Sequence, residues 1–400
     1  MTTRLCIMMF LLYVAYGAVL PIMTMYMTSN LHFTGSQTGF INAAMSISAF
    51  ASPLIGVILV DKIISAERMF VLCQIVAAIA MFFIRSATEY NHVLFLYVIY
   101  YAAFGPTLAL SNAIAFHHLP NARSKFGFIR VWGSIAWIFV GVAFSYLWLR
   151  DSNGQFVTER LADCFTLAGI TSVILAIYGL TMPKRICEPQ KDKSVFPISS
   201  FKVFCNPRMA LVGIGFFMIS AVGKYYYFGA SIYLKAIGVQ QENIMPLMAV
   251  GQIPEVFGML VLSWMLKRYG CKKVLMIGLV TELWRCGCLM YGGNIWIIGT
   301  GIFCHGLSYS LFITTTFVFL ENFCTSESRS GAHQLFSMLN AGFASLTGSI
   351  LAGQCLDWFT VDESTNFQQF WSVPFFMTLA YFVFMLIFFR PTAEENSTHQ

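Results

Sequence analysis

Five ionisable residues lie within long apolar stretches of the sequence, namely Arg130, Lys224, Glu255, Glu282 and Arg285. On insertion scales a charge at the centre of a membrane helix costs about 2.5–3.5 kcal/mol, so such side chains pair or line a polar cavity. Glu282 and Arg285 are three positions apart and can pair on one helix, where the pair either stabilises the fold or holds a gate closed. The other three lie in separate stretches, with no opposite charge beside them in sequence. They predict a central cavity whose polar partners come from other helices or from a ligand.

Polar and aromatic residues recur around these charges at the spacing of one helix face. Arg130, Ser134 and Trp137 place a cation, a hydroxyl and an aromatic ring along one stripe. Gln252 and Glu255 share a second face. Aromatic residues in membrane helices also serve packing, and hydroxyls also bond backbone carbonyls. A single candidate therefore does not indicate a binding site, whereas several on one helix face do. The remaining candidates are Lys224 with Tyr227, and the run of His305, Tyr309 and Ser310.

Amides, hydroxyls, aromatic rings and a few charges suit a neutral, polar and partly planar ligand. Nucleobases stack on rings and ribose hydroxyls bond amides and carboxylates, although sugars satisfy the same set. Glu255 is the only carboxylate in this predicted set and is the candidate for proton exchange. A membrane potential supplies about 2.3 kcal/mol per charge per 100 mV, which is adequate for secondary active transport. The sequence contains no phosphate-binding loop and no metal-ligand motif, so it implies no ATP, metal or other cofactor.

The elements that must position these residues follow from composition and hydropathy. Of the 400 residues, 58% are hydrophobic and 10% are charged, whereas soluble proteins carry about 25% charged residues. The chain is therefore predicted to be an all-α integral membrane protein, because a bilayer offers no water to unpaired backbone groups. Twelve spans of the length that a bilayer requires are predicted at 5–27, 37–60, 69–85, 92–117, 127–149, 162–182, 208–236, 243–266, 273–291, 295–320, 332–355 and 369–389.

Basic residues are distributed unevenly between the predicted spans. The termini and the even-numbered connections contain 17 Lys and Arg, and the odd-numbered connections contain four. Because basic residues concentrate on the cytoplasmic side, both termini are predicted to be cytoplasmic. The net charge of +6 is thus a topology signal and does not imply nucleic acid as a partner.

The longest internal polar stretch divides the predicted spans into six and six, the arrangement of a parallel-repeat transporter. The predicted organisation is an N-terminal six-helix bundle at 1–182, a cytoplasmic linker at 183–207, and a C-terminal six-helix bundle with a short tail at 208–400. The charged turn after the second span contains Asp61 and Arg68. These two residues either latch a cytoplasmic gate or remain solvated.

Several stretches resemble one known family. FGPTLALSNAIAFHHL (104–119), FGFIRVWGSIAWI (126–138), GQIPEV (251–256) and HGLSYSLF (305–312) are similar to the nucleoside:proton symporters of the major facilitator superfamily, and PLIGVILVDKIISAERMF (53–70) resembles a loop of the superfamily. The resemblance covers nearly the whole chain. It implies a monomer that imports nucleosides with protons by alternating access, from a site between the two six-helix halves.

The resemblance also implies roles for single residues. The family's fifth-span arginine, hydroxyl and aromatic ring match Arg130, Ser134 and Trp137, and its eighth-span amide and carboxylate match Gln252 and Glu255. Glu255 is then the coupling or ribose-binding acid, and Arg130 is its counter-charge or a donor to substrate. Trp137 and Tyr227 either stack on the base or line the pocket that holds it.

The sequence departs from the family at three positions. Ser310 stands where studied members carry an aspartate, and Lys224 and Tyr227 stand where polar amides are expected. A Lys224–Glu255 pair would hold Glu255 ionised and weaken proton coupling, and Ser310→Asp is expected to strengthen the pH dependence. A permease for a sugar or an aromatic acid, an uncoupled carrier or an exporter remain alternatives. An enzyme is not expected, because His305 and Ser310 are five apart and do not share a helix face.

Overall fold

The computed structural model describes residues 1–55, 64–118, 122–151, 153, 155–183, 198–325 and 329–389. This part of the chain is almost entirely helical, as predicted. The α-helices are α1 (Thr2–Val19), α2 (Met23–Ser29), α3 (Gly35–Ala43), α4 (Ile47–Leu54), α5 (Ala66–Ser86), α6 (Tyr90–His118), α7 (Ala122–Ala143), α8 (Asp163–Leu180), α9 (Pro207–Ala236), α10 (Gln241–Val250), α11 (Gln252–Tyr291), α12 (Ile295–Ser308), α13 (Thr315–Glu321), α14 (Arg329–Ser337), α15 (Ser345–Trp358) and α16 (Phe367–Phe388).

Short helical segments of other types connect or interrupt these helices. In the described part of the chain, three are 3₁₀ segments, η1 (Ala44–Ser46), η4 (Thr158–Ala162) and η5 (Ile198–Cys205). Three are π segments, η3 (Phe144–Trp148), η6 (Tyr309–Thr314) and η7 (Met338–Ala344). One small hairpin pairs β1 (Thr360–Val361) with β2 (Ser364–Thr365) in antiparallel register.

Ten helical segments of the described chain are long and apolar enough to cross a membrane. The prediction of twelve separate spans differs from this set at two places. The predicted span 37–60 is described only as far as residue 55, by α3, η1 and α4. The predicted spans 243–266 and 273–291 form one segment, Gln241–Tyr291, with a kink at Gly270. Gly270 has a φ of 75°, which a residue without Cβ adopts at little cost.

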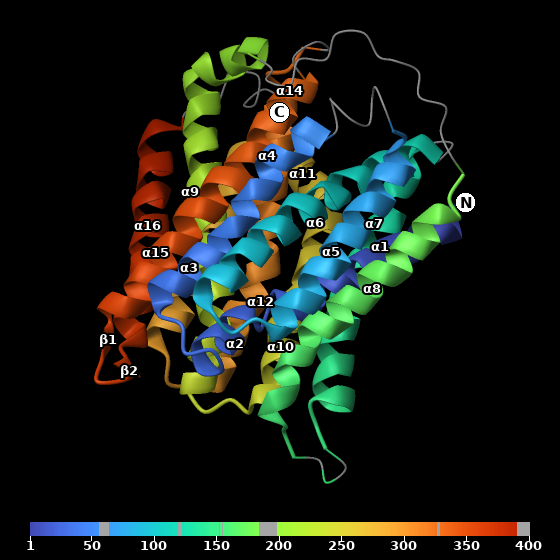
Figure 1. Ribbon diagram of the computed structural model, residues 1–400. Helices are drawn as coiled ribbons and strands as arrows, with labels where there is room; N and C mark the ends of the chain where they lie inside the picture. Colours follow the sequence, from blue (N-terminus) through green and yellow to red (C-terminus); the bar gives the residue numbers. More distant parts are fainter. Residues whose placement is uncertain are drawn as a thin grey trace. The chain divides into compact units, whose positions relative to one another are not determined.

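Internal contacts group the chain into two compact units, of which the first comprises Met1–Val195 and Tyr227–Pro246. In this unit α5 packs against α6 and α8, and α1 packs against α7 and α8 (Figure 1). A Cβ on Gly179 of α8 would lie 2.7 Å from Val71 of α5. Small residues at such contacts let membrane helices approach closely.

The second unit comprises Phe196–Tyr226 and Leu247–Gln400. Its central helix α11 packs along α12 and α16 and contacts η6. Buried aromatic rings fill the core of this unit, with the Phe216 and Phe336 centroids 4.7 Å apart. The Tyr381 hydroxyl donates to the Leu211 carbonyl at 3.2 Å, so this buried phenol is satisfied.

The predicted boundary between two bundles stays a prediction. Residues 184–197 of the predicted linker lie outside the described part of the chain. The contacts also group Tyr227–Pro246, which follow that linker in sequence, with the first unit.

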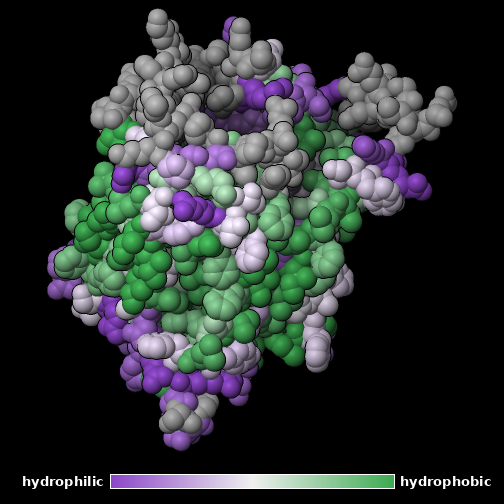
Figure 2. All heavy atoms as spheres, turned by 90° about the vertical axis from the view of Figure 1, so that its right-hand side faces the viewer, coloured by the Kyte–Doolittle hydropathy of each residue, from purple (hydrophilic) through white to green (hydrophobic). Residues whose placement is uncertain are grey.

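Large apolar side chains point outward on the helices of the first unit. On α5, Leu72, Ile79 and Phe83 are 49%, 52% and 60% exposed and lie along one stripe. Figure 2 shows apolar side chains gathered in a broad band across the viewed face, with hydrophilic side chains toward its two edges. Such a band is unfavourable in water and is solvated by hydrocarbon. The exposed stripe therefore identifies lipid-facing surfaces of membrane-spanning helices.

Candidate functional site

The predicted stripe on α7 faces aromatic residues of α1. The guanidinium carbon of Arg130 lies 4.4 Å from the centroid of the Tyr13 ring, a cation–π contact. Gly133 makes this approach possible, because a Cβ there would lie 2.8 Å from both Arg130 Nη1 and Tyr13 Cδ2. Arg130 and Ser134 are half-buried. A cation and a hydroxyl thus lie one helical turn apart beside a tyrosine ring.

Trp137 continues the same face into an aromatic cluster. Its buried ring meets Tyr16 edge-on at 5.4 Å and Tyr227 edge-on at 6.2 Å. Tyr16 in turn stacks on Phe104 of α6 at 5.8 Å. A Cβ on Gly17 would lie 3.2 Å from Trp137, so α1 offers the indole a flat surface. The structure brings Trp137 and Tyr227 together, and their role as a wall for a ligand stays a prediction.

Tyr13 and Tyr16 are the residues of this face that the sequence reasoning missed. Their centroids are 6.4 Å apart on α1, at a spacing of three. Two tyrosines three positions apart in the most apolar span of the described chain were the only indication in the sequence that this helix face differs from a lipid-facing one. This spacing did not reveal which helix α1 packs against, and packing against α7 is what brings the two rings beside Arg130 and Trp137.

Gln252 and Glu255 occupy the first turn of α11 in the second unit. Gln252 is buried and Glu255 is half-buried. This turn lies directly against α12, because a Cβ on Gly306 would come within 3.0 Å of the Glu255 Cα. Lys224 on α9 is also half-buried. The predicted Lys224–Glu255 ion pair stays a prediction.

The two candidates of η6 differ in their surroundings. Tyr309 is 37% exposed, whereas Ser310 is fully buried. The Ser310 hydroxyl donates to the Leu307 carbonyl at 3.1 Å, and its side chain lies against Gly258 of α11, where an added Cβ would overlap it. Ser310 therefore lies at a tight helix contact. Both residues lie in a π segment, a type of helix that is frequent at functional sites. The spacing of residues in the sequence did not indicate this segment.

Glu282 and Arg285 form the ion pair that their spacing predicts, and both are 1% exposed. Arg285 also contacts residues on two other helices. Its Nη1 lies 2.8 Å from His305 Nδ1, and its guanidinium carbon lies 4.4 Å from the Tyr226 centroid. The His305 ring stacks on the same tyrosine at 4.8 Å. These four residues, Glu282, Arg285, His305 and Tyr226, form the Arg285 cluster of the second unit.

The predicted gate turn is described in part. Asp61 lies outside the described residues. Arg68 is half-buried in the first turn of α5, and its backbone N–H is capped by the Ser65 hydroxyl at 3.4 Å. The adjacent Glu67 is buried and lies 2.9 Å from His118 Nε2 at the end of α6. A pair between α5 and α6 therefore anchors this turn, and the role of Arg68 stays a prediction.

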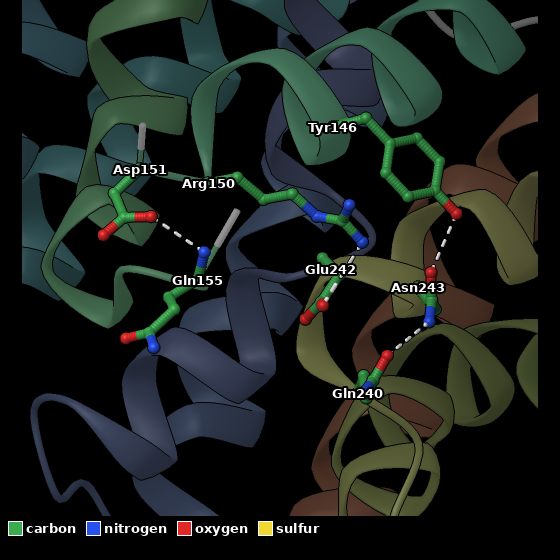
Figure 3. Close-up of polar contacts among 7 residues, drawn as sticks. All are labelled: Tyr146, Arg150, Asp151, Gln155, Gln240, Glu242 and Asn243. Carbon is green, nitrogen blue, oxygen red and sulfur yellow. Dashed lines mark hydrogen bonds and ion pairs between the residues drawn. The ribbon is translucent and has the colours of Figure 1, made fainter. Parts of the chain in front are cut away.

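A polar cluster within the first unit joins segments that are far apart in sequence (Figure 3). Arg150 Nη2 lies 3.4 Å from Glu242 Oε1, and its guanidinium carbon lies 4.9 Å from the Tyr146 ring. The Tyr146 hydroxyl donates to Asn243 Oδ1 at 2.8 Å, and Asn243 Nδ2 donates to Gln240 Oε1 at 3.2 Å. We call Arg150, Tyr146, Glu242, Asn243 and Gln240 the Arg150 cluster.

A second contact supports the same connection. Lys235 Nζ, near the end of α9, donates to the Ser29 hydroxyl at the end of α2 at 2.8 Å. The connection between α9 and α10 is thus tied to the rest of the first unit at two places. Sequence spacing does not reveal such contacts, because Arg150 and Glu242 are 92 positions apart.

Comparison with known proteins identifies the family of this chain. A family model described as Nucleoside H+ symporter matches residues 1–394. The chain belongs to the nucleoside H+ symporter family. Two relatives are from Escherichia coli (strain K12): the xanthosine permease is 31% identical, with 96% of this chain and 94% of the permease covered, and the nucleoside permease NupG is 26% identical, with 99% of each covered. This symporter-family member also superposes on a crystal structure of the nucleoside transporter NupG with a TM-score of 0.86 and 25% identity, over 98% of this chain and 99% of that one.

Proposed function

We propose that this protein imports nucleosides across a bacterial inner membrane together with protons, by alternating access. The observation that carries the proposal is the face of α7, where Arg130 lies over Tyr13 and Trp137 meets Tyr16 and Tyr227. Rings beside a cation and a hydroxyl match a nucleobase, which stacks on aromatic faces and hydrogen-bonds at its edge. Membership of the nucleoside H+ symporter family supports both the substrate and the proton.

The proposed contacts come from α7, α9 and α11. Trp137 and Tyr227 wall the base, while Arg130 and Ser134 donate hydrogen bonds to it. Gln252 and Glu255 bond the ribose hydroxyls, and Glu255 exchanges the coupled proton. Lys224, Tyr309 and Ser310 complete the proposed set. Ser310 acts through its contact with α11, since its hydroxyl is already bonded to Leu307.

We propose xanthosine as the first substrate to test. A relative at 31% identity is named a xanthosine permease. The base of xanthosine loses a proton more readily than the bases of adenosine and uridine, and an anionic base suits the Arg130 cation on the α7 face. Uridine and adenosine are the matched neutral competitors, and a disaccharide tests the sugar alternative.

The Arg150 cluster is the proposed outer gate. Arg150 and Glu242 lie in the connections that follow the fifth and seventh predicted spans, which the excess of basic residues elsewhere assigns to the outside. Alternating access requires that contacts at one end of the protein break as the other end closes. The Arg150–Glu242 pair is partly buried and the two hydrogen bonds beside it are exposed, so the cluster is weak enough to break repeatedly.

Uptake of labelled xanthosine, uridine and adenosine tests the proposal in cells that lack their own nucleoside permeases. We expect concentrative uptake that a protonophore collapses. Uptake that equilibrates and ignores the protonophore would contradict proton coupling. If the protein is present in the membrane and none of the three nucleosides enters, nucleoside transport itself is wrong.

A further inference from the structure

The contact between Arg285 and His305 defines the state of the imidazole. A guanidinium only donates hydrogen bonds, so His305 Nδ1, 2.8 Å from Arg285 Nη1, must accept. An accepting Nδ1 carries no proton, and His305 is therefore neutral with its proton on Nε2. A second proton on the ring would place two cations beside the single carboxylate of Glu282.

The Arg285 cluster is closely confined. Glu282, Arg285 and His305 are 1%, 1% and 8% exposed. The imidazole and the guanidinium both lie against the Tyr226 ring, at 4.8 Å and 4.4 Å from its centroid. Without an acceptor at position 305, a buried cationic N–H of Arg285 loses its partner, which is costly in an apolar interior.

His305 also lies where α12 meets the first turn of α11. A Cβ on Gly251 would be 3.5 Å from the His305 Cβ, and a Cβ on Gly306 would be 2.5 Å from the Glu255 backbone nitrogen. The two backbones therefore touch at this point. His305 therefore lies on the part of α12 that packs against the turn carrying Gln252 and Glu255.

We propose that His305 is a positioning residue of the transport site. As a neutral acceptor for Arg285, it holds α12 against the first turn of α11 and thereby orients Glu255 toward the nucleoside. Among the described residues, Arg285 from α11 and Tyr226 from α9 face it, and Glu282 is paired with Arg285. This inference rests on the proposed function, because it takes Glu255 to contact substrate.

Two variants of the full-length protein distinguish the contribution of the hydrogen-bond acceptor of His305 from that of its aromatic ring. His305→Phe keeps a ring against Tyr226 and loses the acceptor, whereas His305→Asn places an amide oxygen near the position of Nδ1 and cannot be protonated. We expect His305→Phe to weaken binding of labelled xanthosine to the purified protein by about tenfold and His305→Asn by no more than about twofold. Equal affinities of the two variants would overturn the proposal, as would a loss confined to the melting temperature.

A double-mutant cycle tests whether His305 acts through Glu255. In a Glu255→Gln background we expect His305→Phe to cost less than about twofold in affinity, because the group that it positions is already altered. The same tenfold loss in both backgrounds would show independent action and refute the proposal. If Glu255→Gln alone abolishes binding, the cycle cannot be measured. The affinities of His305→Phe and His305→Asn then decide whether the proposal stands. Failure of the proposed function is distinguishable, since the wild-type protein would then bind none of the three nucleosides.

Discussion

At the scale of single residues, the charges inside the membrane helices fall into two groups. Glu282 and Arg285 are almost completely buried and paired. Arg130, Lys224 and Glu255 are half-buried. A charge in a membrane helix must be compensated, and the accessible group is the one that can change partners during a transport cycle. Arg130, Lys224 and Glu255 are therefore expected to act in transport. Glu282 and Arg285 are expected to hold the helices in position.

Glu255→Gln is expected to abolish concentrative uptake while leaving the protein folded in the membrane. The amide keeps hydrogen-bonding capacity but cannot exchange a proton, so exchange of labelled for unlabelled nucleoside should persist. Uptake against a gradient and counterflow, measured on the same vesicles, check this expectation. Glu159→Gln, at an exposed carboxylate of η4, is the matched control. Wild-type accumulation in Glu255→Gln would contradict the coupling role.

Ser310→Asp is expected to reduce the amount of folded protein. The sequence favoured this substitution as a restored coupling carboxylate, but the Ser310 side chain lies against Gly258 with no room for a larger group. Overpacking of this kind costs about 1–3 kcal/mol. The melting temperature in detergent measures the loss, with Ser310→Ala as the control. A stable Ser310→Asp protein with steeper pH dependence would instead support the expectation from sequence.

At the scale of elements, glycines determine how closely the site helices approach. Gly133 admits the Arg130–Tyr13 contact between α7 and α1, and Gly306 admits the contact of α12 with the first turn of α11. Each lies within a helix, where glycine costs about 1 kcal/mol relative to alanine. The close approach of site residues offsets that cost.

Gly133→Ala is expected to weaken nucleoside affinity by about fivefold to tenfold, because the new methyl group displaces Arg130 from Tyr13. Gly127→Ala on the same helix is the matched control, since a Cβ there meets no described atom within 4 Å. Binding of labelled nucleoside to the two purified variants gives the comparison. Equal affinities would show that the Arg130–Tyr13 contact does not shape the site.

Breaking the Arg150 cluster is expected to favour the state that is open at that end. Glu242→Gln removes the carboxylate charge opposite Arg150, and a partly exposed pair of this kind contributes up to about 1 kcal/mol, or about a fivefold change in population. The reaction rate of a cysteine placed at Ser29 with an impermeant maleimide reports the opening. Asp151→Asn, which alters only the neighbouring turn, is the control. An unchanged labelling rate would argue against a gate.

At the scale of the whole molecule, a lipid-facing surface and an uneven distribution of basic residues define how the chain lies in the membrane. The exposed apolar stripe on α5 requires hydrocarbon around it. The excess of Lys and Arg in the termini and even-numbered connections predicts that those segments face the cytoplasm. This orientation also assigns the Arg150 cluster to the outer side.

Site-specific labelling tests the orientation. In a background without other cysteines, Cys205, which is exposed in η5, should react with an impermeant maleimide only after the membrane is opened. Asn153→Cys, at an exposed turn, should react in intact cells. The reverse pattern would invert the predicted topology and place the Arg150 cluster in the cytoplasm.

Properties that depend on neighbouring residues could be predicted from sequence. Hydropathy identified the membrane helices, the three-residue spacing predicted the Glu282–Arg285 pair, and the spacing on α7 placed Arg130 and Trp137 on one face. Such features depend on interactions within one turn or along one helix, and helical periodicity is the same in every fold.

Contacts between distant segments were decided only by the tertiary structure. His305 meets Arg285 across two helices, Tyr13 meets Arg130 from α1, and Arg150 meets Glu242 across 92 positions. Each needs a specific packing angle and register that no local pattern encodes, because an apolar helix face can pack against many others. The sequence determined which residues need partners inside the membrane, and the packing of the helices selected those partners.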